Sequence, residues 1–105
     1  VMPDQVIILP ISDKYQIYTE KVLHLLENSE IRALVDSRSE KTGRKIRDAE
    51  VGKIPFMLIL GEKEENEGTV SVRRHGEGDI GTFSIQEFIS LIKKEISKTI
   101  TEFHN

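Results

Sequence analysis

The residues best suited to do chemistry in this chain lie between positions 38 and 53, where basic side chains are concentrated. This segment holds six basic and three acidic residues and so carries a charge of +3, whereas the rest of the chain carries -6 (9 basic, 15 acidic). A positive segment on an acidic body favours a local anionic partner over general binding to polyanions. The net charge of -3 argues against nonspecific binding to long nucleic acid but permits a small, specific RNA contact. The six basic residues are Arg38, Lys41, Arg44, Lys45, Arg47 and Lys53.

Two other motifs are weaker candidates for chemistry. Arg74–Glu77 reads R-H-G-E, as at a phosphohistidine site, but such a site needs a second catalytic histidine, and only His104 follows. The glycines of G-E-G-D-I-G, residues 76–81, have the spacing of a dinucleotide loop. The acidic side chains between them would repel a pyrophosphate, so we expect a flexible glycine turn. We predict no catalytic residue in this chain.

The sequence also gives no sign of a metal site. There is no cysteine, and the three histidines are scattered without the short spacing that would present two ligands to one ion. The acidic stretch of residues 62–68 does not have the spacing of a calcium loop, and we expect a solvated loop there.

The basic segment lies between predicted strands of an alternating chain. Apolar runs predict strands over Gln5–Leu9, Ile31–Val35 and Phe56–Leu60. A helix is predicted from an N-cap at Ser12 to about Asn28, and a second over Thr42–Val51. The basic turn that precedes the second helix thus follows the carboxyl end of a strand, where open α/β sheets place their ligand crevices.

The rest of the chain completes the domain. Gly52 is expected to end the second helix in a left-handed conformation. Thr69–Arg74 alternates apolar and polar residues, which is typical of a half-exposed strand. Ser84 and Glu87 form a capping box at the start of a last helix, whose apolar positions recur from residue 85 to Ile96. We expect a frayed tail over residues 98–105.

This order of elements predicts an α/β fold with a mixed sheet and helices on both faces. A length of 105 residues fits one domain, so we assign residues 1–105 to a single unit. Because the chain starts at Val1 without an initiator methionine, we expect it to be a fragment of a longer polypeptide. No apolar run is long enough to cross a membrane, and the N-terminus does not read as a secretory signal.

Three separated motifs carry a resemblance to a known family. They are D-x-R-x-E-K-x-G-x-K-I-R at Asp36–Arg47, K-I-P-F-M-L-I-L-G at Lys53–Gly61, and V-S-V-R-R at Val70–Arg74. In this order they resemble the C-terminal anticodon-binding domain of class II aminoacyl-tRNA synthetases, shared by the threonine, proline, histidine and glycine enzymes. The motif sequences are most similar to those of threonyl-tRNA synthetase, and the resemblance extends from Gln5 to Ile96. The resemblance implies a three-layer domain with a mixed, mostly parallel five-stranded sheet, three flanking helices and a short fifth strand near residues 80–83.

The resemblance also implies which residues read RNA. Carried over by motif, the anticodon readers become Ser39, Glu64 and Arg73, with Lys53 as a further contact. A glutamate accepts from guanine N1–H and N2–H while an arginine donates to O6 and N7, so the pair suits guanine. Ser39 departs from the asparagine usual at its position, which leaves the reading of uracil open. Residues expected to contact the RNA backbone are Arg38, Lys41, Arg44 and Arg74.

These expectations define the predicted function and partners. The domain would read the anticodon stem-loop of tRNA(Thr) as part of a cytoplasmic threonine-tRNA ligase, and would not bind DNA or a membrane. It would need no cofactor and would not aminoacylate alone. ATP, Mg and Zn are expected only in the other domains of a parent enzyme, which would be a homodimer with its own catalytic domain.

Alternative functions remain open at this point. The same fold could come from a prolyl or histidyl synthetase, or from a non-catalytic tRNA-sensing regulator. A small α/β nucleotide-binding enzyme or receiver-like regulator would need an acidic or nucleophilic cluster at the strand ends, where only Asp36 is available.

Overall fold

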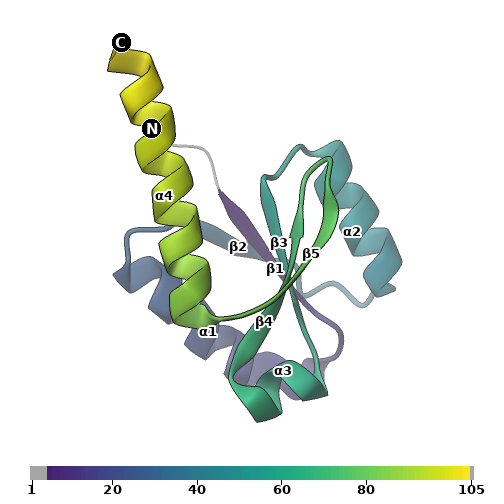
Figure 1. The fold of residues 1–105 in the computed structure, drawn as a ribbon. Coiled ribbons are helices and arrows are strands. Elements are labelled where there is room, and N and C mark those ends of the chain that lie inside the picture. Colours follow the sequence, from purple (N-terminus) through teal and green to yellow (C-terminus); the bar gives the residue numbers. More distant parts are fainter. Residues whose placement is uncertain (1–4, 105) are drawn as a thin grey trace.

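The computed structural model describes residues 5–104, with side chains described for residues 5–95. It holds one five-stranded sheet, in the order β2-β1-β3-β4-β5, with helices on both faces (Figure 1). The elements are β1 (Val6–Pro10), a 3-10 turn (Asp13–Tyr15), α1 (Gln16–Asn28), β2 (Ala33–Val35), α2 (Thr42–Val51), β3 (Phe56–Leu60), α3 (Glu62–Glu67), β4 (Thr69–Arg74), β5 (Gly78–Ser84) and α4 (Ile85–His104).

The predicted mixed sheet is confirmed. β1 pairs in parallel with β2 and β3, whereas β3 with β4 and β4 with β5 are antiparallel, so the pairings divide evenly. Because β1, β2 and β3 run the same way, their carboxyl ends meet at one edge of the sheet. We call this the carboxyl edge. The opposite end, where β3 begins and β4 finishes, is the amino edge.

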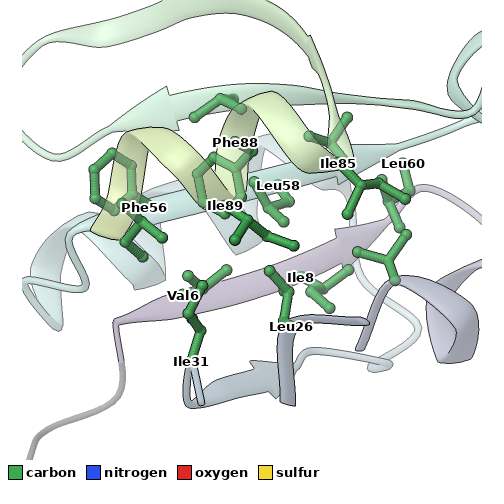
Figure 2. Packing of buried hydrophobic residues seen from close by; sticks show 14 of the residues in the cluster. Val6, Ile8, Leu26, Ile31, Phe56, Leu58, Leu60, Ile85, Phe88 and Ile89 are labelled. Carbon is green, nitrogen blue, oxygen red and sulfur yellow. The ribbon is translucent and has the colours of Figure 1, made fainter. Parts of the chain in front are cut away.

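The larger core lies between the sheet and helices α1 and α4. Figure 2 shows α4 laying Phe88 and Ile89 over side chains of β1 and β3, with Leu26 of α1 in the same cluster. The rings of Phe56 and Phe88 meet edge to face, with their centroids 5.5 Å apart. α2 lies on the other face of the sheet, over a smaller cluster of Leu9, Ala49 and Met57 with Ile7, Ile46, Ile54 and Ile59 at its margin. Ile46 and Ala49 are therefore the apolar residues that α2 packs against the sheet.

The start of α4 is as the sequence predicts. The Ser84 N–H donates to Glu87 Oε1 and the Glu87 N–H donates to Ser84 Oγ, each at 3.1 Å. The first of these bonds lowers the pKa of the Glu87 carboxyl. The described backbone continues as helix to His104, so the expectation of a frayed tail from residue 98 is wrong there, and Ile96 lies outside the described side chains.

Three local expectations are corrected by the structure. The acidic stretch expected to be a loop is the short helix α3, with three acidic side chains in its first turn that complement the helix dipole. The fifth strand is longer than expected and runs over Gly78–Ser84. Gly52 has a right-handed φ of -74°, and the left-handed residue is Lys53, with φ 57°.

The end of α2 explains this one-residue shift. The Lys53 N–H donates to the Glu50 carbonyl and the Ile54 N–H donates to the Ala49 carbonyl, at 3.0 and 3.1 Å. These two bonds define a Schellman motif, in which the left-handed residue is the first one past the cap. Gly52 is the cap itself, so the left-handed position falls on Lys53.

Candidate nucleic-acid interface

The turn after β2 forms one wall of a pocket at the carboxyl edge. The Asp36 N–H donates to the Ile8 carbonyl at 3.0 Å, which fixes the start of this turn beside β1. A pocket of about 220 Å³ lies between this turn and the loop after β1. Ser39 lines the pocket and is exposed, as a residue that meets a ligand must be. The lining residues are Pro10, Ile11, Ser12, Asp13, Ser37, Arg38, Ser39, Glu40 and Lys45.

Lys45 lies at the base of this pocket and is almost completely buried, with 4% of its surface exposed. Its Nζ donates to the Asp36 carbonyl at 3.1 Å and to the Pro10 carbonyl at 3.4 Å. It therefore joins the ends of β1 and β2 and supports the turn that carries Ser39. Lys45 is one of the six basic residues between positions 38 and 53, but this role could not be predicted, because no local sequence pattern marks a lysine that turns inward.

Arg38 is held by two carboxylates. Its Nε and Nη2 donate to the two oxygens of Asp36 at 2.9 and 2.8 Å, and Nη2 also donates to Asp48 at 2.8 Å. The hydrogen bonds from Arg38 lower the pKa of Asp36, and those to Asp36 and then Asp48 raise the pKa of Arg38. Arg44 forms a 3.9 Å ion pair with the same Asp48. Arg38 and Arg44, two of the residues predicted to contact the RNA backbone, are therefore already paired with acidic side chains.

Glu64 lies on α3, directly after the carboxyl end of β3, and is only 9% exposed. Its Oε1 accepts from the Gly61 N–H at 2.8 Å and its Oε2 accepts from the Ser71 hydroxyl at 3.0 Å. A Cβ on Gly61 would lie 2.8 Å from Cδ1 of Ile11 and 3.2 Å from Oε1 of Glu64, so a larger residue here would displace the exposed Ile11 side chain and crowd the carboxylate. Glu64 thus ties α3 to both β3 and β4.

Arg73 lies on β4 and faces the same side of the sheet as Ser71, two residues before it. The register places Arg73 opposite Met57, on the side of the sheet that α2 partly covers. Its Nε is buried and has no hydrogen-bond partner among the described residues. Buried polar groups are nearly always paired, so this unpaired donor indicates a ligand or water.

An irregularity between β4 and β5 shapes the surface around Arg73. The register shifts at Val72/Arg73, so that Arg73 pairs with Asp79 while Ile80 packs into the larger core. Bulges of this kind often re-aim side chains beside functional sites. Ser71, Arg73, Asp79 and Thr82 then form a polar surface over β4 and β5, which we call the open face.

The structure brings together some of the predicted residues and separates others. Ser39 and Glu64 both follow strands at the carboxyl edge, whereas Arg73 is the last residue but one of β4 and lies on the open face toward the amino edge. Lys41 is at the start of α2 on this edge, whereas Lys53 lies past the other end of the helix, at the amino edge. The rise of a ten-residue helix puts these two ends about 15 Å apart.

Arg74 lies on the opposite face from Arg73. Its guanidinium is 5.3 Å from the centre of the Phe56 ring and forms ion pairs with Glu95 at 3.1 Å and Glu77 at 3.5 Å. Its side chain is therefore directed toward α4 and away from the open face.

The two weaker motifs form a turn and not a site. Gly76 and Gly78 have positive φ in and beside the turn between β4 and β5, as expected of a glycine turn, whereas Gly81, also with positive φ, lies within β5 at the register shift. His75 contacts the end of α2, with its Nε2 3.1 Å from the Glu50 carbonyl. Within the part of the chain that the structure describes, no group of three His, Cys, Asp or Glu side chains could hold a metal ion. No helix among the described residues is long and apolar enough to cross a membrane.

A family model described as "Anticodon binding domain" matches residues 5–95 of this chain. Among curated proteins, the threonine-tRNA ligase of Flavobacterium johnsoniae is 59% identical over 105 residues, covering 98% of this chain. That of Bacteroides fragilis is 54% identical over 101 residues, covering 96% of the chain. In both cases the chain spans 16% of the length of the relative.

Solved structures show the same fold. The RNA binding domain of threonyl-tRNA synthetase from Cryptosporidium parvum superposes with a TM-score of 0.82 at 23% identity, covering 88% of this chain and 23% of that one. Histidyl-tRNA synthetase from Nostoc superposes with a TM-score of 0.82 at 18% identity, covering 90% of this chain and 23% of that one. At these sequence identities the superpositions support the architecture alone and do not distinguish a threonine enzyme from a histidine enzyme.

Proposed function

Because the chain belongs to the anticodon-binding domain family, we propose that it reads the anticodon loop of a threonine tRNA as one domain of a threonine-tRNA ligase. The identity of 59% to such a ligase favours threonine over proline or histidine, which the fold alone does not separate. The observation that carries the proposal is the buried Nε of Arg73, which has no partner among the described residues and lies on the same face of β4 as Ser71, the residue that holds the carboxylate of Glu64.

The two side chains are chemically complementary to guanine. Arginine donates to O6 and N7, and a carboxylate accepts from N1–H and N2–H, so together they contact both edges of this base. Adenine presents an acceptor at N1 and a donor at N6, which reverses the pattern that the pair offers. We therefore infer that Glu64 and Arg73 select the central guanine of the GGU anticodon.

The remaining predicted residues complete the proposal. Ser39 would contact the third base from the wall of its pocket, and Lys41 and Lys53 would contact the loop from the two ends of α2. Arg38 and Arg44 would have to share their carboxylate partners with phosphate. We propose that aminoacylation, with its ATP, Mg and Zn, belongs to other domains of a homodimeric cytoplasmic enzyme, and that this domain joins a catalytic domain in the same polypeptide.

The test measures binding of synthetic anticodon stem-loops to the domain at low salt by fluorescence anisotropy. The GGU loop is compared with a loop whose central guanine is adenine, for the wild-type domain and for Arg73→Ala. We expect the wild type to prefer guanine roughly 10-fold or more, since a good base-edge pair contributes about 1–3 kcal/mol of discrimination. Arg73→Ala should abolish this preference.

Arg74→Ala is the matched control, because the neighbouring arginine lies on the other face of the sheet. It should keep the preference for guanine. Equal binding of both loops by the wild type would refute the proposed reading, and equal losses in the two variants would refute the assignment to Arg73.

A further inference from the structure

We propose that Ser71 is a positioning residue, which fixes the carboxylate of Glu64 for guanine and thereby sets how strongly the central base is discriminated. The inference rests on the proposed function and adds a residue that no motif of the sequence assigns. It starts from the 3.0 Å hydrogen bond that the Ser71 hydroxyl donates to Oε2 of Glu64.

The carboxylate of Glu64 is held at both of its oxygens by donors from different elements. Oε1 accepts from the backbone of Gly61 at 2.8 Å, between β3 and α3, and Oε2 accepts from Ser71 on β4. A single bond would leave the carboxylate free to rotate about that contact. With two bonds, its plane is fixed relative to the sheet.

A fixed plane matters because guanine offers two parallel donors. Each carboxylate oxygen has about two lone-pair positions, so one on each oxygen remains after the contacts to Gly61 and Ser71. Guanine N1–H and N2–H can occupy both at once only if the carboxylate already has the matching orientation. Side chains that are pre-arranged in this way lose less entropy on binding.

Ser71 also lies between the two proposed readers. It is two residues from Arg73 along β4, a separation of roughly 6.6 Å, and on the same face. Across the strands, its Oγ is 3.5 Å from Oγ1 of Thr82 on β5. This neighbour gives the hydroxyl a second polar contact on the open face, so Ser71 connects the carboxylate of Glu64 to the surface on which Arg73 lies.

The test uses Ser71→Ala, which removes one hydroxyl from a half-buried strand position and adds no atoms. Binding is measured to the GGU loop, to the loop with central adenine, and to a loop with central inosine, which lacks the 2-amino group. We expect Ser71→Ala to weaken binding of the guanine loop about 3- to 10-fold and to leave binding of the adenine loop unchanged. The loss for inosine should be smaller than for guanine.

A double-mutant cycle with Glu64→Gln separates positioning from general stability. If Ser71 acts through the carboxylate, Ser71→Ala should have no further effect on the guanine loop in the Glu64→Gln background. Ser71→Thr keeps a hydroxyl at the position and should restore binding. Thermal unfolding shows whether the Ser71→Ala protein is folded. If it is not, Ser71→Thr becomes the test, and loss of the guanine preference in that variant would contradict the proposal.

Several results would overturn the inference. Equal losses for guanine and adenine loops, or additive losses in the cycle, would give Ser71 a merely structural role. An unchanged guanine preference in Ser71→Ala would remove it from the site while the proposed function stands. A wild-type domain without any guanine preference would instead refute the proposed function itself.

Discussion

Replacing Lys53 should separate the stability of the domain from its affinity for RNA. Lys53 is exposed and adopts φ 57° as the left-handed residue of the Schellman motif that ends α2. Its backbone N–H and that of Ile54 complete the motif at 3.0 and 3.1 Å, and a glycine would keep both bonds. The variants Lys53→Gly and Lys53→Ala remove the same charge, but only the glycine removes the steric cost of the left-handed backbone.

The magnitude follows from this geometry. A left-handed residue with a Cβ costs roughly 1–2 kcal/mol, and a glycine loses about 0.5–1 kcal/mol more backbone entropy on folding than alanine. Lys53→Gly should therefore be about 0.5–1 kcal/mol more stable than Lys53→Ala. For a domain of this size, this difference raises the Tm by roughly 2–8 °C. Thermal unfolding followed by circular dichroism measures it directly.

Binding of the GGU loop supplies the second half of the experiment. If Lys53 contacts a phosphate, both variants should bind the loop more weakly by the same factor, and the slope of log K against log salt should fall by roughly 0.7 in each. Equal Tm values for the two variants would refute the account of backbone strain. Wild-type binding in both would remove Lys53 from the interface.

Two further predictions concern the start of α2 and the turn before it. Gly43 has no neighbour within 4 Å of where a Cβ would lie, so Gly43→Ala should stabilise the domain by about 0.5–1 kcal/mol in urea unfolding. If RNA approaches this first turn of α2 closely, the same variant should bind the GGU loop more weakly. Unchanged binding would place the RNA elsewhere. The pKa of Asp36 is lowered by Arg38, so the stability that this carboxylate contributes is complete above about pH 4 and is lost as the pH falls through its lowered pKa. Asp36→Asn should remove this part of the acid dependence in urea unfolding between pH 7 and pH 2, and parallel profiles for the two proteins would contradict the assignment.

Helices and strands were predicted well from the sequence where their bounds depend only on neighbouring residues. The bounds of α2 and β3 and the capping box of Ser84 and Glu87 all follow from short patterns, because each depends on neighbouring residues. The end of α2 shows where such patterns fail. A glycine marks the end of a helix within one residue, but whether it is the cap or the left-handed residue depends on the bonds to Glu50 and Ala49, which the sequence does not specify.

The sequence supplies a list of candidate site residues but not their arrangement. Motif order led to Ser39, Glu64 and Arg73, and the structure puts Glu64 and Arg73 on adjoining elements through Ser71. The alternation of β4 is enough to place Ser71 and Arg73 on one face, but it does not indicate that Ser71 reaches Glu64. The inward turn of Lys45 depends on the carbonyls of two strand ends far apart in the chain, so no sequence pattern indicated it.

The structure changes the meaning of the basic segment from which the function was first inferred. Of its six cations, Arg38 and Arg44 are paired with acids and Lys45 is buried against backbone carbonyls. The other three, Lys41, Arg47 and Lys53, are exposed. Three phosphate contacts to a single strand give a salt slope of only about -2, too shallow for electrostatics to dominate recognition. Under the proposed function, selectivity would then come mainly from the open face, where the buried Nε of Arg73 has no partner among the described residues and Ser71 holds the carboxylate of Glu64.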